Sequence, residues 1–259
     1  MPSRTREQAL VRGPLLTIAA TAWLLNAIDT VSNGGSAAHG ASGGGRPMGL
    51  ASTAAGWLLM LAAMAPLLTE PVRHLRVRSL ARRRARVITL FVVGYLGVWL
   101  VACGALTDVA GLIARTGPAP AATALAVALA WGSTPARGRC LNRAHAHPAL
   151  PAFGLAGDLA ALRFGLAHGV WCVGTCWALM LLPLVVIPAA APAVMAGVAL
   201  WLVVERLAGP EPPAWGLRVP AAVQVCAARW AGWWSGVGRR PTFRIGRGAS
   251  HPAPRPDAA

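Results

Sequence analysis

The longest stretch without a charged side chain runs from Phe164 to Val204, a length of 41 residues. As a single helix it would extend about 60 Å, roughly twice the hydrocarbon thickness of a bilayer. Proline ends or kinks a helix because it lacks an amide N–H, and this stretch contains Pro183, Pro188 and Pro192. We therefore predict a hairpin of two membrane-spanning helices.

The composition supports an integral membrane protein and argues against a soluble enzyme. Charged residues make up 12% of the 259 residues and hydrophobic residues 56%, whereas a soluble domain carries roughly 25% charged residues. Further uncharged windows in the sequence predict membrane spans in addition to the two of the hairpin. The predicted fold is an all-α, polytopic membrane helix bundle of about six spans, near residues 14–31, 50–69, 87–107, 119–136, 164–187 and 190–206.

The net charge of +16 first suggests a nucleic-acid partner. The positions of the basic residues, which are all Arg, indicate otherwise. If the N-terminus is cytoplasmic, 22 of the 24 lie on the cytoplasmic side, and only Arg46 and Arg115 lie outside. We therefore predict that both termini are cytoplasmic, that the protein resides in the cell (inner) membrane beside anionic lipids, and that no nucleic acid is bound.

The composition also predicts two domains. Residues 1–208 form the six-span bundle, and residues 209–259 form a basic, Trp- and Pro-rich cytoplasmic tail, in which Val219–Val237 is expected to lie at the lipid interface. The first span has an alternative interpretation as a cleaved signal peptide, since it follows an Arg-containing segment.

A stripe of soft metal ligands is the main functional candidate. His168, Cys172, Cys176 and Met180 recur every four residues, so they share one face of the fifth span. Imidazole, thiolate and thioether groups favour copper, especially Cu(I), or zinc. The alternative is ordinary packing, because Cys and Met are common core residues, and Gly165 with Gly169 forms a small-residue helix contact.

The second span adds a pair of thioethers one turn apart, Met60 and Met64. Counted from Glu70, they lie about 15 and 9 Å deep, close to the depths of Cys172 and His168 in the antiparallel fifth span. We therefore expect a metal site between these two spans. Packing is the alternative for this methionine pair as well.

A second candidate lies in a cytoplasmic loop, where Cys140, His145 and His147 precede Pro148. The spacing is that of a partial metal site, since no second cysteine completes a zinc finger. The competing interpretation is a solvated basic loop near anionic headgroups.

Four motifs occur in order between Trp57 and Glu205. They are Trp57-x-x-Met60-x-x-Ala63-Met64-x-Pro66, then Gly94-Tyr95-Leu96-x-x-Trp99, then Arg137-x-x-Cys140-Leu141 ending at Pro148, and finally Gly165-x-x-His168-Gly169-x-x-Cys172-x-Gly174-x-Cys176-Trp177-Ala178-Leu179-Met180. Together they resemble a family of bacterial integral membrane proteins described as predicted metal-binding, of unassigned function. The resemblance implies a multi-span protein with a soft metal site.

The chain departs from that family at three positions and resembles a degenerate member of it. Ala144 and Thr175 stand where the family often has Cys, as in its CxGCCW-type motif, and Ala65 stands where it often has Met. Three soft ligands are therefore missing.

These observations favour a non-enzymatic membrane protein that binds copper for metal handling or delivery to a partner protein. Two alternatives stay open. One is a membrane thiol–disulfide oxidoreductase that uses Cys172 and Cys176, although redox thiols usually lie near an aqueous surface. The other is a metal-free structural or partner subunit.

Overall fold

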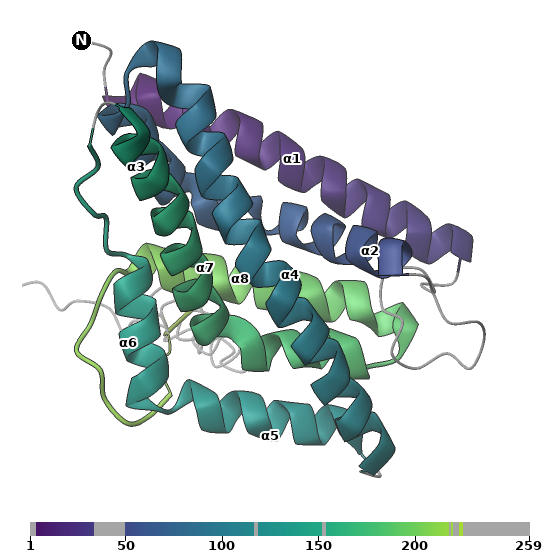
Figure 1. Ribbon diagram of the computed structural model, residues 1–259. Coiled ribbons are helices and arrows are strands. Elements are labelled where there is room, and N and C mark those ends of the chain that lie inside the picture. Colours follow the sequence, from purple (N-terminus) through teal and green to yellow (C-terminus); the bar gives the residue numbers. More distant parts are fainter. Residues whose placement is uncertain are drawn as a thin grey trace, which may run out of the picture. The chain divides into compact units, whose positions relative to one another are not determined.

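The computed structural model describes residues 4–33, 50–116, 119–151, 154–217, 219 and 223–224. Within these residues every element is helical, which confirms the predicted all-α class (Figure 1). The elements are α1 (Arg4–Asn33), α2 (Leu50–Ala63), η1 (Ala65–Leu68), α3 (Thr69–Arg78), η2 (Ala81–Arg83), α4 (Arg84–Thr116), α5 (Pro120–Gly132), α6 (Pro135–Ala144), α7 (Gly154–Val185), η3 (Pro188–Ala190) and α8 (Ala191–Ala208). The chain divides at Pro220, and the fold described here is that of Met1–Pro220.

Four of the described helices are long and apolar enough to cross a membrane, namely Ala9–Ile28, Ala81–Arg115, Gly154–Val185 and Ala191–Ala208. The bent pair Ala55–Ala63 and Ala65–Arg78 would supply a fifth. Six spans and the orientation of the termini are not confirmed. The span expected near 119–136 is the 13-residue helix α5, about 20 Å long and so too short to cross alone. The helix expected over Val219–Val237 falls almost entirely outside the described residues.

The span predicted near 50–69 is broken. Helix α2 ends at Ala63, the short 3-10 helix η1 follows, and α3 continues in a direction bent by 63°. Pro66, in the first turn of η1, has no N–H to continue the α2 hydrogen-bond ladder. Met64 stands at the break with φ of −95° and ψ of 9°. A hydropathy window detects the apolar residues here but not the change in direction.

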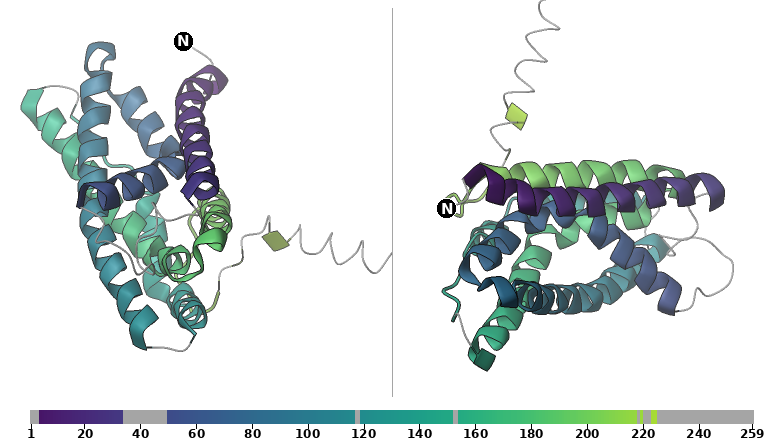
Figure 2. Two further views of the ribbon diagram at one scale, coloured as in Figure 1. Left: turned by 90° about the vertical axis from the view of Figure 1, so that its right-hand side faces the viewer. Right: turned by 90° about the horizontal axis from the view of Figure 1, so that it is seen from above.

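The most extensive helix contact joins α4 and α7, which run past each other in all three ribbon views (Figures 1 and 2). Glycines permit the close approach. A Cβ atom at Gly165 would clash with the Phe91 carbonyl oxygen, and one at Gly94 would lie 2.6 Å from the Leu162 carbonyl oxygen. Small residues at a helix crossing let backbones meet at this distance. The packing interpretation of the Gly165 and Gly169 pair therefore holds.

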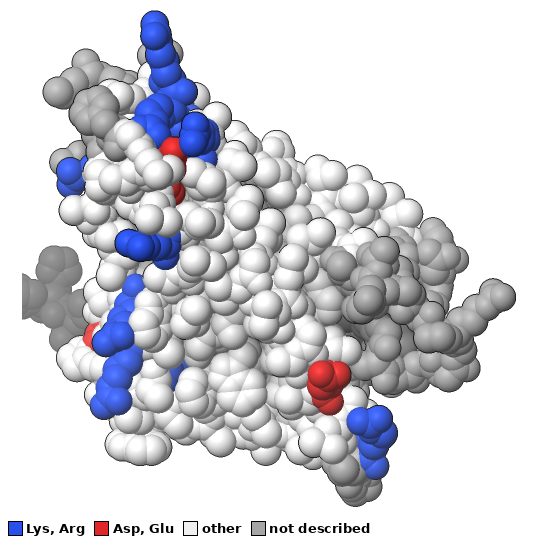
Figure 3. Space-filling model, in the orientation of Figure 1, with Lys and Arg blue, Asp and Glu red and all other residues white. Residues whose placement is uncertain are grey.

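Ion pairs fix the basic end of the bundle, which we define as residues 73–86, 137–143 and 163. Asp158 in the second turn of α7 accepts from Arg83 at 2.6 Å and from Arg86 at 2.7 Å. These pairs tie the start of α7 to η2 and to the start of α4. On the face shown in Figure 3, Arg side chains gather mainly along one edge and leave a broad uncharged area beside it.

Candidate metal centre

The two cysteines of the predicted stripe lie together inside the bundle. Cys172 is 3% exposed and Cys176 is 1% exposed. Both are free thiols that interact electrostatically with each other, and the Cys176 thiol donates to the Cys172 carbonyl oxygen at 3.1 Å. The i, i+4 spacing on one helix face produces this neighbourhood directly. His168 and Met180 of the same stripe are buried as well.

Two groups from other helices act on this thiol pair. The hydroxyl of Tyr95, on α4, lies 3.6 Å from the Cys172 sulfur. Arg206, near the end of α8, exerts its positive charge on Cys172. Two contacts with the α6 terminus hold Arg206 in place: its Nη1 donates to the Ala144 carbonyl at 3.1 Å, and its carbonyl oxygen lies 3.1 Å from Nε2 of His145.

The sequence interpretation gave neither Tyr95 nor Arg206 a role at the thiols. One signal for Tyr95 was available, since it is the chain's one tyrosine and lies in an apolar span. For Arg206 the signal was a charged residue at the last turn of a helix predicted to cross the membrane. The position of Tyr95 and Arg206 relative to the thiols depends on how helices that are far apart in the sequence pack against one another.

The predicted thioether ligands occupy the same buried cluster as the thiols. Met60, Met64 and Met180 are 6%, 5% and 0% exposed, and the cluster also holds Tyr95 and Trp99. The sulfur-bearing side chains of α2 and α7 thus share one apolar interior. The main neighbour of α7 is α4, however, whereas α2 packs mainly against α1.

His168 is buried one turn before Cys172 and is 3% exposed. Its ring lies among three aromatic rings, with centroid distances of 5.8 Å to Phe91, 5.9 Å to Phe164 and 6.0 Å to Tyr95. Its Nε2 has no hydrogen-bond partner in the described part of the chain. A buried imidazole nitrogen without a partner is available to a ligand.

Arg137 anchors the thiol-bearing turn of α7 from α6. Its Nε donates to the Thr175 carbonyl at 3.0 Å, and its Nη2 donates to the Glu205 carboxylate on α8. All three side chains are at least 95% buried. On the same side, a Cβ atom at Gly174 would lie 2.8 Å from the Cys140 sulfur. Helix α6 is therefore seated directly on the Cys172–Cys176 segment.

The three loop candidates face different surroundings. Cys140 lies against Gly174, whereas Nδ1 and Nε2 of His145 lie 2.8 and 3.1 Å from the carbonyl oxygens of Leu141 and Arg206. The His147 ring lies 4.9 Å from that of His74. In the described ranges, no three or more His, Cys, Asp or Glu side chains form a group arranged for a metal ion.

The loop environment shifts the pKa of two of these groups, Cys140 and His147. Burial raises the pKa of the Cys140 thiol, and the charges of Arg143 and Arg137 oppose this only in part. Partial burial lowers the pKa of His147, and repulsion from His74 lowers it further. Both shifts favour the neutral forms. Thr175, where the family often has Cys, donates its hydroxyl to the Trp171 carbonyl at 2.7 Å.

A family model described as "PpoB2: Copper chaperone" matches residues 54–233, well over half of the chain. The chain belongs to the PpoB2 copper chaperone family. The match includes every residue of the thiol pair and its neighbours, from Met60 to Arg206, and leaves α1 outside. A copper-related role is therefore supported, in agreement with the metal prediction. Comparisons with curated proteins and with solved structures find no match.

Proposed function

We propose that this member of the copper chaperone family is an integral membrane protein that holds Cu(I) at Cys172 and Cys176 and passes it to a partner protein. Met60, Met64 and Met180 supply thioethers from the surrounding cluster, and His168 supplies an imidazole. The observation that carries the proposal is the buried pair of free thiols one turn apart on α7, with the positive charge of Arg206 acting on Cys172.

The donor set suits Cu(I) for a chemical reason. Thiolate and thioether sulfur are soft ligands that select Cu(I) over hard cations. Zinc is less well served, because its structural sites use four Cys or His ligands, and the described residues contain no such group.

The charge balance also favours Cu(I). Two thiolates and one Cu(I) carry a net charge of −1, which would be costly to bury without compensation. Arg206 places a positive charge at Cys172 and offsets that cost.

Exposed apolar side chains favour insertion in a membrane. Leu16 and Leu24 on α1, Val101 on α4 and Leu200 on α8 are 55–77% exposed. Such surfaces suit acyl chains rather than water. The positions of the Arg residues favour an orientation with the basic end in the cytoplasm, next to anionic lipids, and with both termini on that side.

Metal analysis of the purified protein tests the copper site. We expect about one Cu(I) per chain in the wild type and in the Cys103→Ser variant, because Cys103 is a buried free cysteine of the same cluster but lies outside the proposed ligand set. Cys172→Ser and Cys176→Ser should each lose the ion, and Met60→Leu should weaken its binding. Full copper retention in the Cys172→Ser/Cys176→Ser double variant would refute the site.

The proximity of the two thiols also suits a disulfide-forming pair, so thiol–disulfide exchange is the second candidate function. Burial disfavours it, because exchange requires the attacking thiolate to be accessible. Thiol exchange that needs both cysteines in copper-free protein would favour this function. A protein that neither binds copper nor exchanges thiols would instead favour the structural subunit.

A further inference from the structure

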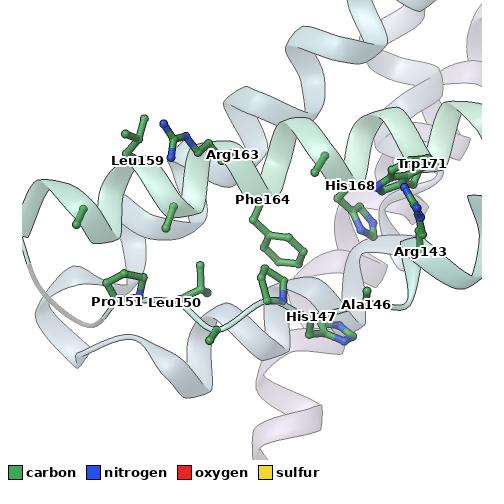
Figure 4. Close-up of a pocket in the computed structure, with 15 residues that line it drawn as sticks. Arg143, Ala146, His147, Leu150, Pro151, Leu159, Arg163, Phe164, His168 and Trp171 are labelled. Carbon is green, nitrogen blue, oxygen red and sulfur yellow. The ribbon is translucent and has the colours of Figure 1, made fainter.

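A cavity of about 650 Å³ lies beside the first half of α7 and is bounded by the end of α6 and the segment that follows it (Figure 4). Its volume lies within the range of about 300–1,000 Å³ typical of small-molecule sites. Most of its lining is apolar, from alanine, proline and leucine side chains and from Phe164 and Trp171. It lies outside the set of sulfur ligands proposed above, none of which lines it.

His168 connects this cavity to the thiol pair. The residue lines the cavity, is 3% exposed and has an Nε2 without a hydrogen-bond partner among the described residues. In Figure 4 its ring and that of Phe164 both point from α7 toward the segment that carries His147. Cys172 follows one helical turn later, about 6 Å along the axis. Tyr95 touches both groups, through its ring to His168 and its hydroxyl to Cys172.

The charged groups of the cavity are of one sign. Arg143 and Arg163 line it, and no Asp or Glu is among its lining residues. The Arg143 guanidinium lies 4.6 Å from the centroid of the Trp171 ring, which positions it at the cavity wall. Such a site repels a bare metal cation and attracts an anion.

We propose that this cavity receives copper(I) as an anionic complex with a small thiol carrier, and that His168 takes the ion before it reaches Cys172. The inference rests on the proposed copper site and adds its substrate form and access route. Arg143 and Arg163 hold the carboxylates of the carrier, and the apolar walls exclude water from the exchanging ligands.

The transfer is a ligand exchange with no change in oxidation state. The His168 nitrogen lone pair forms a bond to copper as the bond from copper to the carrier sulfur weakens. The sulfurs of Cys172 and Cys176 then bond to the ion in place of the two carrier thiolates of the anionic complex. The two cysteine protons go to these thiolates, which leave as neutral thiols. Bonds, charge and protons balance without an oxidant or reductant.

Stopped-flow loading of the reduced, full-length protein in lipid nanodiscs tests this route. The two probes are the anionic complex of Cu(I) with glutathione and the cationic complex of Cu(I) with acetonitrile, and the signal is the ultraviolet absorption of the copper–thiolate bond. We expect Arg143→Gln/Arg163→Gln to slow loading from the glutathione complex about tenfold or more, without slowing loading from the acetonitrile complex. His168→Asn should slow loading from both.

Two further variants separate the route from general damage. Ala160→Phe fills the cavity without removing a ligand and should also slow loading from both probes, since Ala160 lines the cavity. Arg139→Gln removes the same charge from α6 at a position that does not line the cavity, and should load as the wild type does. Final copper occupancy should equal that of the wild type in the arginine variants and in Ala160→Phe.

Wild-type rates in the His168 and Ala160 variants, or equal effects of the arginine changes on both probes, would overturn the access route. A wild-type protein that binds no copper from either probe at equilibrium would instead overturn the proposed function itself.

Discussion

Replacement of Arg206 by glutamine should weaken Cu(I) binding without abolishing it. The positive charge of Arg206 acts on Cys172, and an opposite charge beside an ionisable group stabilises its charged form by about 1.4–3 kcal/mol. When copper binds, the two thiolates make the site anionic, so the interaction is stronger in the loaded state than in the neutral dithiol. Since 1.4 kcal/mol corresponds to a tenfold change in an equilibrium constant, we expect the affinity to fall by about 10- to 100-fold.

Competition with a chromophoric Cu(I) chelator measures this affinity. Arg206→Lys retains the charge and should recover a large part of the loss, which distinguishes charge compensation from shape. Because Arg206 also donates to the Ala144 carbonyl, the thermal unfolding of each variant should be measured alongside. An Arg206→Gln protein that folds normally and binds Cu(I) within twofold of the wild type would refute the role of the guanidinium.

Three further predictions concern the framework around the site. Glu205→Gln leaves the buried guanidinium of Arg137 without its charge partner and should lower the free energy of unfolding by about 3–5 kcal/mol. The Arg137→Met/Glu205→Met double variant should recover most of this lost stability, as measured by thermal denaturation. Gly165→Ala should destabilise the α4–α7 contact strongly, whereas Gly197→Ala on α8, where a Cβ meets nothing within 4 Å, should stabilise the fold by up to about 1 kcal/mol. The pKa of His147 is lowered in the folded protein, so protonation of this residue favours the unfolded chain. The contribution of His147 to stability is therefore complete above pH 6.5 and is lost as the pH falls toward the lower pKa of the folded state. His147→Gln should remove this part of the pH dependence of the melting temperature.

The sequence predicts the helical hairpin well because its signals are local. Charge-free length and three prolines are enough to place two apolar helices with a break near Pro188, and the structure has α7 and α8 separated by η3. The four-residue spacing from His168 to Met180 likewise predicts one face, and all four side chains are buried. Periodicity determines a face whatever surrounds the helix.

The same local signals do not predict the direction of a broken helix or the contacts between separate helices. The apolar window near 50–69 contains the residues of a span, but Pro66 and the 63° bend divide it. The pair of Arg137 with Glu205 joins positions 68 residues apart, and the charge of Arg206 on α8 acts on Cys172 of α7. Neither follows from spacing along one helix, because each depends on how separate helices pack.

Long-range contacts also supply groups around the proposed copper site, which has fewer soft ligands than the sequence resemblance implies. Soft ligands are absent at Ala65, Ala144 and Thr175. The two remaining thiols are surrounded by other groups that act on them. Arg206 supplies charge, Tyr95 contacts the Cys172 sulfur, and α6 is seated on the intervening turn. A two-thiolate site with a fixed counter-charge and neighbouring thioethers can release its ion by ligand exchange more readily than a closed four-ligand site. Fewer strong ligands are therefore compatible with the proposed delivery of copper.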